Sequence, residues 1–226
     1  MEYTAVVLAA GRGSRTGLPY NKVFWKMPSG QSVLGCSLQA FYKDPDCAQI
    51  VLAIDTEELS DILSILEEEG IDMDKVELAA GGKTRQESVW SALSKAKAPY
   101  VMVHDAARPY ISDQLLERLK KAVEEKKAVV PAVPVVDTIK IMDEEGKVVS
   151  TPVRAHLASV QTPQCFATPL LTDASNRAMS EGFVGTDDAQ LVEKYEDVPV
   201  WIVEGEMTNH KITNPQDIQS ASQNGR

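Results

Sequence analysis

The sequence predicts an α/β fold built on a doubly wound, mainly parallel sheet. Short, nearly continuous apolar runs recur along the chain, and such runs are typical of strands covered on both faces. Segments with the apolar spacing of helices separate these runs, and this alternating order is typical of a parallel sheet. The length of 226 residues suits one domain. We therefore expect a single domain over residues 1–226.

Each expected strand is a short apolar run that ends at polar or turn-forming residues. The first such run, Val6-Val7-Leu8-Ala9-Ala10, breaks into a glycine-rich stretch. The six runs expected to form the sheet lie at 5–9, 50–54, 76–78, 100–103, 128–133 and 200–203.

Helices are predicted from apolar spacing and from the residues that start or stop a helix. The range 57–69 has helical spacing, and Gly70 follows as a stop. Its apolar face consists of Leu59, Ile62, Leu63 and Leu66. Thr84 and Glu87 fit a capping box that opens a helix through residue 96.

Three further helices are predicted in the second half of the chain. One has an apolar face made of Leu115, Leu116, Leu119, Ala122 and Val123. Thr168-Pro169 and Asn214-Pro215 each place a capping side chain before a proline at the first helical position.

One stretch departs from this alternation. Residues 135–141 and 147–154 alternate polar and apolar side chains on either side of the turn Asp143-Glu144-Glu145-Gly146, which is typical of a β-hairpin. We expect this hairpin, at about 135–155, to project from the domain as an arm that reaches a neighbouring subunit.

Composition excludes several classes of protein. Lys and Arg total 23 against 33 Asp and Glu, a formal net charge of −10, so a general nucleic-acid surface is not expected. No apolar run approaches the roughly 18 residues that cross a membrane, and the start lacks the pattern of a signal peptide. The three scattered cysteines do not form a disulfide framework. We expect a cytoplasmic protein.

The glycine-rich stretch after the first strand has three interpretations. A tight turn is the simplest. A dinucleotide site of a nicotinamide dehydrogenase is weakened by Thr16 at the third small position, and by Gln31 where an acidic residue is expected. A phosphate site is favoured, because Arg12, Arg15 and Lys22 follow the glycines closely. The interpretation we favour is a clamp for a triphosphate at the carboxyl end of the strand.

A second signal lies at the end of another apolar run. Val101-Met102-Val103-His104 leads to Asp105 at the carboxyl end of a predicted strand, where open α/β sheets bind ligands. A carboxylate opposite a phosphate clamp is a ligand that Mg²⁺ prefers. The alternative is a helix cap. His104 is expected to pack or to form local hydrogen bonds.

Several motifs then resemble one known family, the 2-C-methyl-D-erythritol 4-phosphate cytidylyltransferases. The likeness extends in order over nearly the whole chain. The motifs are Leu8-Ala9-Ala10-Gly11-x-Gly13-x-Arg15, Gly81-Gly82-x-x-Arg85-x-x-Ser88-Val89, the stretch from His104 to Pro109, Asp137-Thr138-Ile139-Lys140, Gln161-Thr162-Pro163-Gln164, Thr186-Asp187-Asp188-Ala189 and the stretch from Asn209 to Thr213.

The resemblance implies a Rossmann-like fold of the nucleotidyltransferase type and a role for each matching residue. It assigns Arg15 and Lys22 to catalysis, and Asp105 to Mg²⁺, with Asn209 as a second candidate metal ligand. The implied nucleotide-binding residues are Ala9, Ala10, Gly11, Gly13, Gly82, Arg85, Ser88 and Asp105. The implied residues for the acceptor are Arg108, Thr138, Arg154 and Lys211.

The implied reaction joins CTP and methylerythritol phosphate, with pyrophosphate as the second product. The resemblance further implies a homodimer, in which the arm completes the site of the partner subunit. Two alternatives stay open at this point: a ribitol-5-phosphate cytidylyltransferase, and a module that binds CTP without turnover.

The sequence departs from the family pattern at several positions. Thr16 stands where Met is common, and Asn21-Lys22-Val23 replaces the frequent Pro-Lys-Gln. Lys83 stands where an acid is common, and Thr208 or Asn209 stands where some relatives have an acid. These departures bear most on the contacts to the cytosine and on a second metal ligand.

Overall fold

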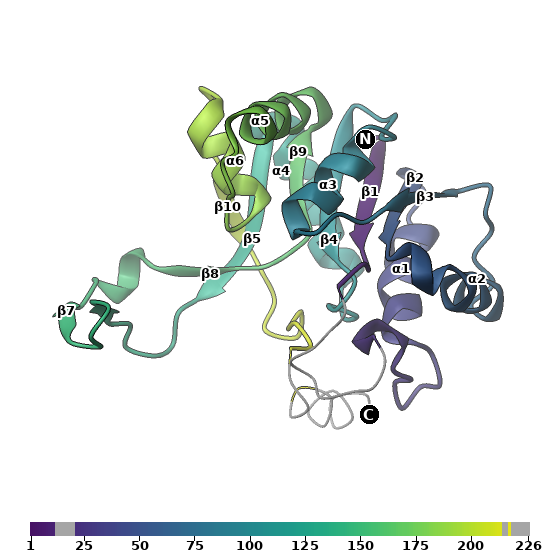
Figure 1. Ribbon diagram of the computed structural model, residues 1–226, viewed down its shortest axis with the longest axis horizontal. Coiled ribbons are helices and arrows are strands. Elements are labelled where there is room, and N and C mark those ends of the chain that lie inside the picture. Colours follow the sequence, from purple (N-terminus) through teal and green to yellow (C-terminus); the bar gives the residue numbers. More distant parts are fainter. Residues whose placement is uncertain (12–20, 214–216, 218–226) are drawn as a thin grey trace.

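The computed structural model describes residues 1–11, 21–213 and 217, and it is organised around one central sheet (Figure 1). The strands of this sheet are β1 (Tyr3–Leu8), β2 (Cys47–Ile54), β3 (Val76–Ala80), β4 (Tyr100–Asp105), β5 (Ala128–Pro134), β8 (Ala158–Val160), β9 (Gln164–Ala167) and β10 (Trp201–Glu204). The α-helices are α1 (Val33–Lys43), α2 (Leu59–Glu68), α3 (Arg85–Leu93), α4 (Asp113–Lys126), α5 (Thr168–Glu181) and α6 (Asp188–Tyr195). Short 3₁₀ helices cover Lys22–Phe24 (η2), Thr56–Glu58 (η3) and Arg154–His156 (η4).

The strand order is β10-β5-β9-β4-β1-β2-β3, and β8 pairs with β5 outside this order. Strand β1 is parallel to both β2 and β4, β2 is parallel to β3, and β5 is parallel to β10. The mainly parallel sheet is therefore confirmed. Strands β8 and β9, which the sequence did not predict, run antiparallel, and β9 lies between β4 and β5.

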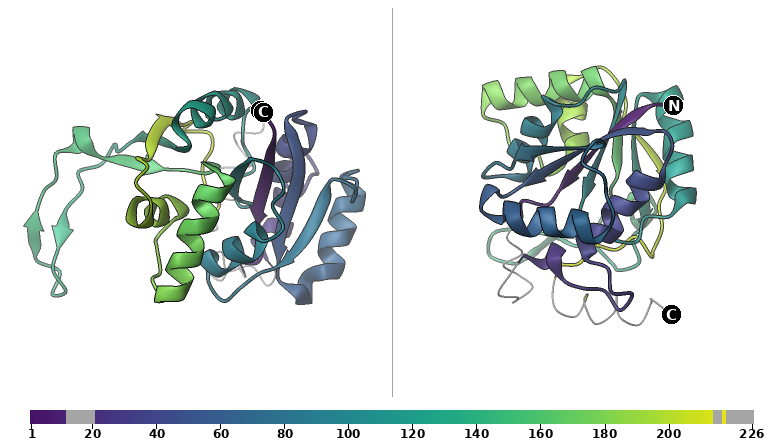
Figure 2. Two further views of the ribbon diagram at one scale, coloured as in Figure 1. Left: turned by 90° about the horizontal axis from the view of Figure 1, so that it is seen from above. Right: turned by 90° about the vertical axis from the view of Figure 1, so that its right-hand side faces the viewer.

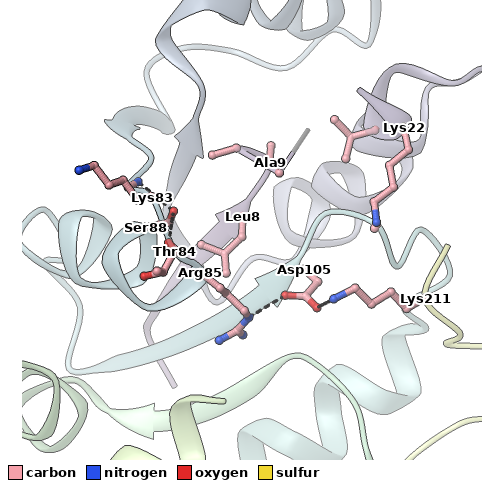
Figure 3. Close-up of a pocket in the computed structure, with 14 residues that line it drawn as sticks. Leu8, Ala9, Lys22, Lys83, Thr84, Arg85, Ser88, Asp105 and Lys211 are labelled. Atoms are coloured by element: carbon pink, nitrogen blue, oxygen red, sulfur yellow. Dashed lines mark hydrogen bonds and ion pairs between the residues drawn. The ribbon is translucent and has the colours of Figure 1, made fainter. Parts of the chain in front are cut away.

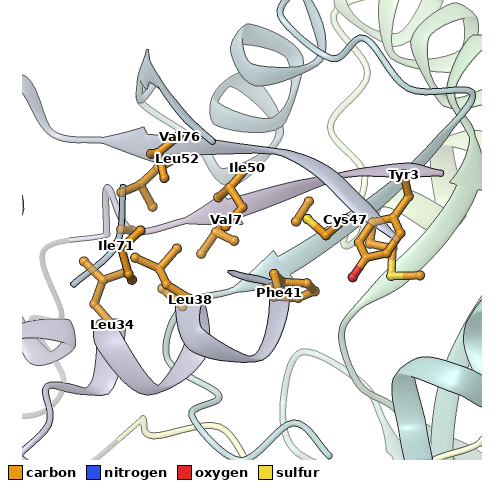
Figure 4. Packing of buried hydrophobic residues seen from close by; sticks show 14 of the residues in the cluster. Tyr3, Val7, Leu34, Leu38, Phe41, Cys47, Ile50, Leu52, Ile71 and Val76 are labelled. Atoms are coloured by element: carbon orange, nitrogen blue, oxygen red, sulfur yellow. The ribbon is translucent and has the colours of Figure 1, made fainter. Parts of the chain in front are cut away.

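Helices cover both faces of the sheet. Successive residues of a strand point to opposite faces, so neighbouring residues of β1 pack against different helices. Ala5 and Val7 pack with α1, α2 and α4 on one face, and Figure 4 shows Val7 facing Leu38 of α1. Val6 packs with α3, α5 and α6 on the other face. This two-sided burial explains why the strands read as continuous apolar runs rather than as alternating ones.

The predicted helices form, with local corrections. In α2 the buried residues are Ile62, Ile65 and Leu66, whereas Leu59 and Leu63, both expected on the apolar face, are each 41% exposed. Thr168 does not cap α5, because its hydroxyl donates a hydrogen bond to the carbonyl of Ala98. The Asn214-Pro215 prediction lies outside the described residues. Within the described part of the chain, no helix has both the length and the apolar character needed to span a membrane.

The predicted arm leaves the sheet after β5 and returns to it at β8 (Figure 2). Its two strands, β6 (Ile141–Met142) and β7 (Val148–Ser150), pair with each other and with no strand of the central sheet. Gly146 closes the turn at a φ of +85°, a conformation that favours glycine. The arm exposes the apolar side chains of Val136, Ile141, Met142, Val148, Val149 and Val153.

Candidate active site

A cavity of about 370 Å³ opens where β1 and β4 end and α3 begins (Figure 3). It is lined by Leu8, Ala9, Ala10, Gly11, Lys22, Val23, Gly82, Lys83, Thr84, Arg85, Ser88, Asp105, Ala107 and Lys211. The carboxyl ends of neighbouring parallel strands meet at one edge, and the cavity occupies that edge of the sheet.

On the side of β1, the cavity wall consists of backbone segments that lie in close contact with one another. The Ala9 amide donates to the carbonyl of Ala53, and the Gly81 amide donates to the carbonyl of Ile54 at 2.7 Å. A side chain at position 81 would bring its Cβ within 2.3 Å of the Cβ of Ala10. Glycine at position 81 therefore lets the end of β3 lie against the glycine-rich stretch that follows β1.

The opposite wall is the first turn of α3. Thr84 caps this helix by accepting a hydrogen bond from the amide of Glu87 at 3.1 Å. The Ser88 hydroxyl accepts from the Gly82 amide and donates to the Thr84 carbonyl, both at 3.0 Å. The segment 82–85 is thus held with the positive end of the helix dipole at the cavity, which favours an anionic ligand.

Asp105 lies between two cations at the end of β4. Its Oδ1 atom is 3.1 Å from Nε of Arg85, and its Oδ2 atom is 2.6 Å from Nζ of Lys211. Burial would raise the pKa of the Asp105 carboxyl, but the charges of Arg85 and Lys211 outweigh burial and hold that pKa well below its usual range. The carboxylate is therefore ionised at any physiological pH.

Arg85 contacts a second carboxylate on its far side. Its Nη2 atom lies 2.8 Å from Oδ2 of Asp188, whose side chain is 1% exposed. Burial raises the pKa of Asp188, and the charge of Arg85 opposes this rise. Two acidic and two basic side chains thus alternate in the order Asp188, Arg85, Asp105, Lys211.

The backbone of Asp105 is held by a chain of hydrogen bonds behind the cavity. The ring Nε2 of His104 is 3.1 Å from the Arg108 carbonyl, which can only accept, so Nε2 carries the hydrogen. Nδ1 then accepts from the hydroxyl of Thr162, and that oxygen accepts from the Asp105 amide at 3.1 Å. Burial lowers the pKa of His104 to about 3. The ring is therefore neutral, as this arrangement requires.

The family of the chain follows from its similarity to known proteins. The family model for 2-C-methyl-D-erythritol 4-phosphate cytidylyltransferase matches residues 3–224. The chain belongs to this family. It is accordingly a nucleotidyltransferase, and the resemblance noted in the sequence is confirmed.

Individual cytidylyltransferases show how much of the chain the likeness covers. The enzyme of Bacillus mycoides (strain KBAB4) is 40% identical over 217 residues, which are 96% of this chain and 94% of that protein. The enzyme of Bacillus velezensis is 42% identical over 219 residues, covering 96% and 93%. The crystal structure of a 4-diphosphocytidyl-2C-methyl-D-erythritol synthase from Anaerococcus prevotii has a TM-score of 0.86 at 32% identity, covering 98% of this chain and 94% of that one.

Most residues that the sequence assigned to a site in this cytidylyltransferase line the one cavity. They are Ala9, Ala10, Gly11, Lys22, Gly82, Arg85, Ser88, Asp105 and Lys211. Gly13 and Arg15 lie outside the described residues. Thr138 and Arg154 do not line the cavity: both are exposed on the arm, where Nη1 of Arg154 donates to the carbonyl of Val136 at 2.7 Å.

Arg108 and Asn209 lie behind the cavity wall rather than in it. Arg108 Nη1 donates to the carbonyl of Asn209 at 2.7 Å, and Asn209 Nδ2 donates to the carbonyl of Thr162 at 2.8 Å. These bonds connect the segment after β10 to the loops after β4 and before β9. Oδ1 of Asn209 is buried with no hydrogen-bond partner among the described residues.

The cavity offers too few protein ligands to bind Mg²⁺ by itself, but it could bind the ion together with the phosphate groups of a substrate. Among the lining residues the single carboxylate is that of Asp105, and the described residues contain no group of three or more His, Cys, Asp or Glu side chains arranged for a metal. Mg²⁺ in nucleotide sites is commonly bound by one or two carboxylates, with phosphate oxygens and water as the other ligands. One carboxylate facing a phosphate site meets that description.

Asp188 and Asn21 are the functional candidates that sequence reasoning missed. Asp187 caps α6 by accepting from the Gln190 amide, whereas the neighbouring Asp188 pairs with Arg85. The Asp187-Asp188 pair was visible in the sequence. Its partner lies 103 positions away, and no local pattern connects the two.

Proposed function

We propose that this cytidylyltransferase joins CTP to 2-C-methyl-D-erythritol 4-phosphate and releases pyrophosphate. The observation that carries the proposal is the gathering of Lys22, Arg85 and Lys211 at one cavity, in a chain whose formal net charge is −10. An acidic protein repels a polyanion over most of its surface, so its cations must be concentrated where a triphosphate binds.

The reaction is a direct displacement at phosphorus. An oxygen of the acceptor phosphate attacks the α-phosphorus of CTP and forms a new P–O bond. The bond from that phosphorus to the bridging oxygen breaks, and pyrophosphate leaves with its electron pair. The attacking phosphate is already ionised near neutral pH, so no general base is needed. Catalysis then depends on positioning the two substrates and on neutralising charge.

The residues of the cavity divide between these two tasks. Lys22, with Arg15, meets the charge that develops on the reacting phosphate oxygens. Lys211 holds the phosphate of the acceptor, and its position beside Asp105 supports this role. Arg108 would assist only if its guanidinium turned from the Asn209 carbonyl, which it contacts behind the wall, into the cavity. The nucleotide is bound by the glycine-rich stretch from Ala9 to Gly13, by Gly82 and Ser88 in front of α3, and by Arg85.

Mg²⁺ would be held by Asp105 together with phosphate oxygens of CTP. Asn209, the second candidate ligand, is fully buried behind the cavity wall, so it would reach the cation only if that wall moved. When bound, the cation withdraws electron density from the phosphate oxygens and so favours the displacement. Asp105 is suited to this role because it is the one carboxylate among the lining residues and is kept ionised by Arg85 and Lys211.

The arm completes the site of a second subunit in this proposal. Thr138 and Arg154 are exposed on the arm and do not line the cavity of their own chain. The arm also exposes a series of apolar side chains, including those of Ile141 and Val149, and exposed apolar surface of this kind is typical of an interface. We infer a homodimer in which each arm brings Thr138 and Arg154 to the other cavity. We also infer a cytoplasmic location, consistent with three free cysteines.

Release of pyrophosphate from CTP tests the proposed function. The assay compares 2-C-methyl-D-erythritol 4-phosphate with ribitol 5-phosphate as the acceptor, each with and without Mg²⁺. We expect turnover with the first acceptor and a dependence on the metal. Faster turnover with ribitol 5-phosphate would overturn the acceptor assignment, and CTP binding without any product would overturn the enzymatic one.

A further inference from the structure

We propose that Asn21 is a positioning residue, which fixes Lys22 relative to the carboxyl end of β1 and acts on the reaction through it. The inference rests on the role proposed above for Lys22. Asn21 itself does not line the cavity, whereas its neighbour Lys22 and the more distant Ala9 both do.

The side chain of Asn21 makes three hydrogen bonds in a buried position. It is 3% exposed. Its Nδ2 atom donates to the carbonyl of Ala9 at 2.9 Å and to Oε2 of Glu58 at 2.8 Å. Its Oδ1 atom accepts from the amide of Val23 at 3.3 Å, which caps the 3₁₀ helix η2. Both donor hydrogens and the acceptor of the amide group are therefore used.

These bonds connect two parts of the cavity wall. Ala9 directly follows β1, and Lys22 is the first residue of η2. The bond to Ala9 holds the start of η2 against the end of β1, and the bond from Val23 fixes the helical turn that carries Lys22. In Figure 3, Lys22 extends its amine from this turn toward Asp105. The point from which the Lys22 side chain starts thus follows from the contacts of Asn21.

Other residue types could not make the same set of contacts. Aspartate would keep the acceptor for Val23 but would lose both donors, and it would place a second negative charge beside Glu58. Alanine would lose all three bonds and leave the Ala9 carbonyl without this donor. Misplacing a reacting group by about 1 Å can cost about 100-fold in rate, so a contact one residue away from Lys22 can control turnover.

A double-mutant cycle tests whether Asn21 acts through Lys22. It compares the natural chain, Asn21→Ala, Lys22→Ala and the double variant by kcat, by the KM for CTP and by melting temperature. We expect Asn21→Ala to lower kcat about 10- to 100-fold in the natural chain, with a smaller change in KM. In the Lys22→Ala background the same substitution should change kcat less than about twofold.

Two further variants separate positioning from stability. Asn21→Asp keeps the cap of η2 but lacks the two N–H donors to Ala9 and Glu58. If these donors position Lys22, this variant should lower kcat as much as Asn21→Ala. It also replaces Asn21→Ala in the cycle if the alanine variant does not fold. Ser112→Ala removes the side-chain cap of α4 and should lower the melting temperature without changing kcat. If Asn21→Ala lowers kcat by the same factor in the natural chain and in the Lys22→Ala background, this inference is overturned and the role proposed for Lys22 still stands. Normal turnover in Lys22→Ala would overturn both this inference and the role proposed for Lys22.

Discussion

Nζ of Lys211 lies 2.6 Å from Oδ2 of Asp105, although 106 positions separate the two residues in the chain. The same carboxylate also contacts Arg85. A substrate that brings phosphate groups into this cavity therefore meets cations whose present partner is Asp105. Substitutions in this group should affect the metal requirement and turnover together.

Asp105→Asn should lower turnover about 10²- to 10³-fold, which is typical of losing one preorganised charged group. The variant has no carboxylate for Mg²⁺, so half-maximal activity should require more metal. Pyrophosphate release over a Mg²⁺ titration measures both effects. Asp113→Asn, an exposed carboxylate at the start of α4, is the matched control and should behave normally. An unchanged metal titration in Asp105→Asn would remove Asp105 from the metal site.

Asp188→Asn should destabilise the fold and lower turnover, because Arg85 loses the buried charge that holds its far side. Removing one partner of a buried ion pair costs about 3–5 kcal/mol, and the remaining amide oxygen should keep the cost at the lower end. Denaturant unfolding and kcat measure the two effects. Asp173→Asn, which changes an exposed carboxylate on α5, should alter neither. Normal kcat in Asp188→Asn would show that Arg85 needs no second carboxylate.

The stability of the protein should fall as the pH drops from about 6.5 to about 3, partly through His104. The unfolded histidine binds a proton near pH 6.5, whereas the buried ring does so only near a pKa of about 3. The contribution of His104 is thus complete above pH 6.5 and is lost as the pH falls, by about 5 kcal/mol in total. Urea unfolding between pH 4 and pH 8 measures this slope.

His104→Asn should reduce this pH dependence, because the titrating group is gone. His156→Asn, at an exposed position in η4, is the control and should leave the slope unchanged. A variant without His104 that keeps the full slope would assign the acid sensitivity to other groups.

A mixture of two inactive variants should recover activity if the arm completes the partner's site. Lys22→Ala damages the cavity, and Arg154→Ala damages the arm. Half of the randomly exchanged dimers would be mixed, and each would have one intact site, so we expect about a quarter of natural activity. Subunit exchange is checked by a mass tag on one variant. Exchange without any recovery would contradict a shared site.

The positions of the main binding residues could be predicted because the signals are local. An apolar strand followed by Gly11, and another followed by Asp105, place these residues at one edge of a parallel sheet without further information. The apolar pattern that predicts a strand fades at the strand's ends, so the ends are located less accurately than the middle. The predicted strand ranges therefore differ from the observed ones mainly at their boundaries.

The features that could not be predicted depend on residues far apart in the chain. Helix α1 is an exception, because its signal is local: Leu34, Leu38 and Phe41 have helical spacing, but Gly35 interrupts the pattern and the helix was not predicted. A Cβ at that glycine would come within 2.3 Å of Oε1 of Glu69, so the glycine is explained by tertiary packing. The pairing of Arg85 with Asp188 and the contacts of Asn21 likewise join residues that are distant in the sequence.

The insertion of β9 between β4 and β5 has a consequence for biosynthesis. The strand that supports the edge of β4 becomes available only after residue 167 has been made, and Lys211 follows later still. A ribosome-bound chain can form β1 to β3 early, but its substrate pocket is incomplete until the segment that carries Lys211 has been made. Nascent chains should therefore acquire nucleotide affinity late and abruptly, and folding should be slow for a protein of this size because so many contacts are long-range.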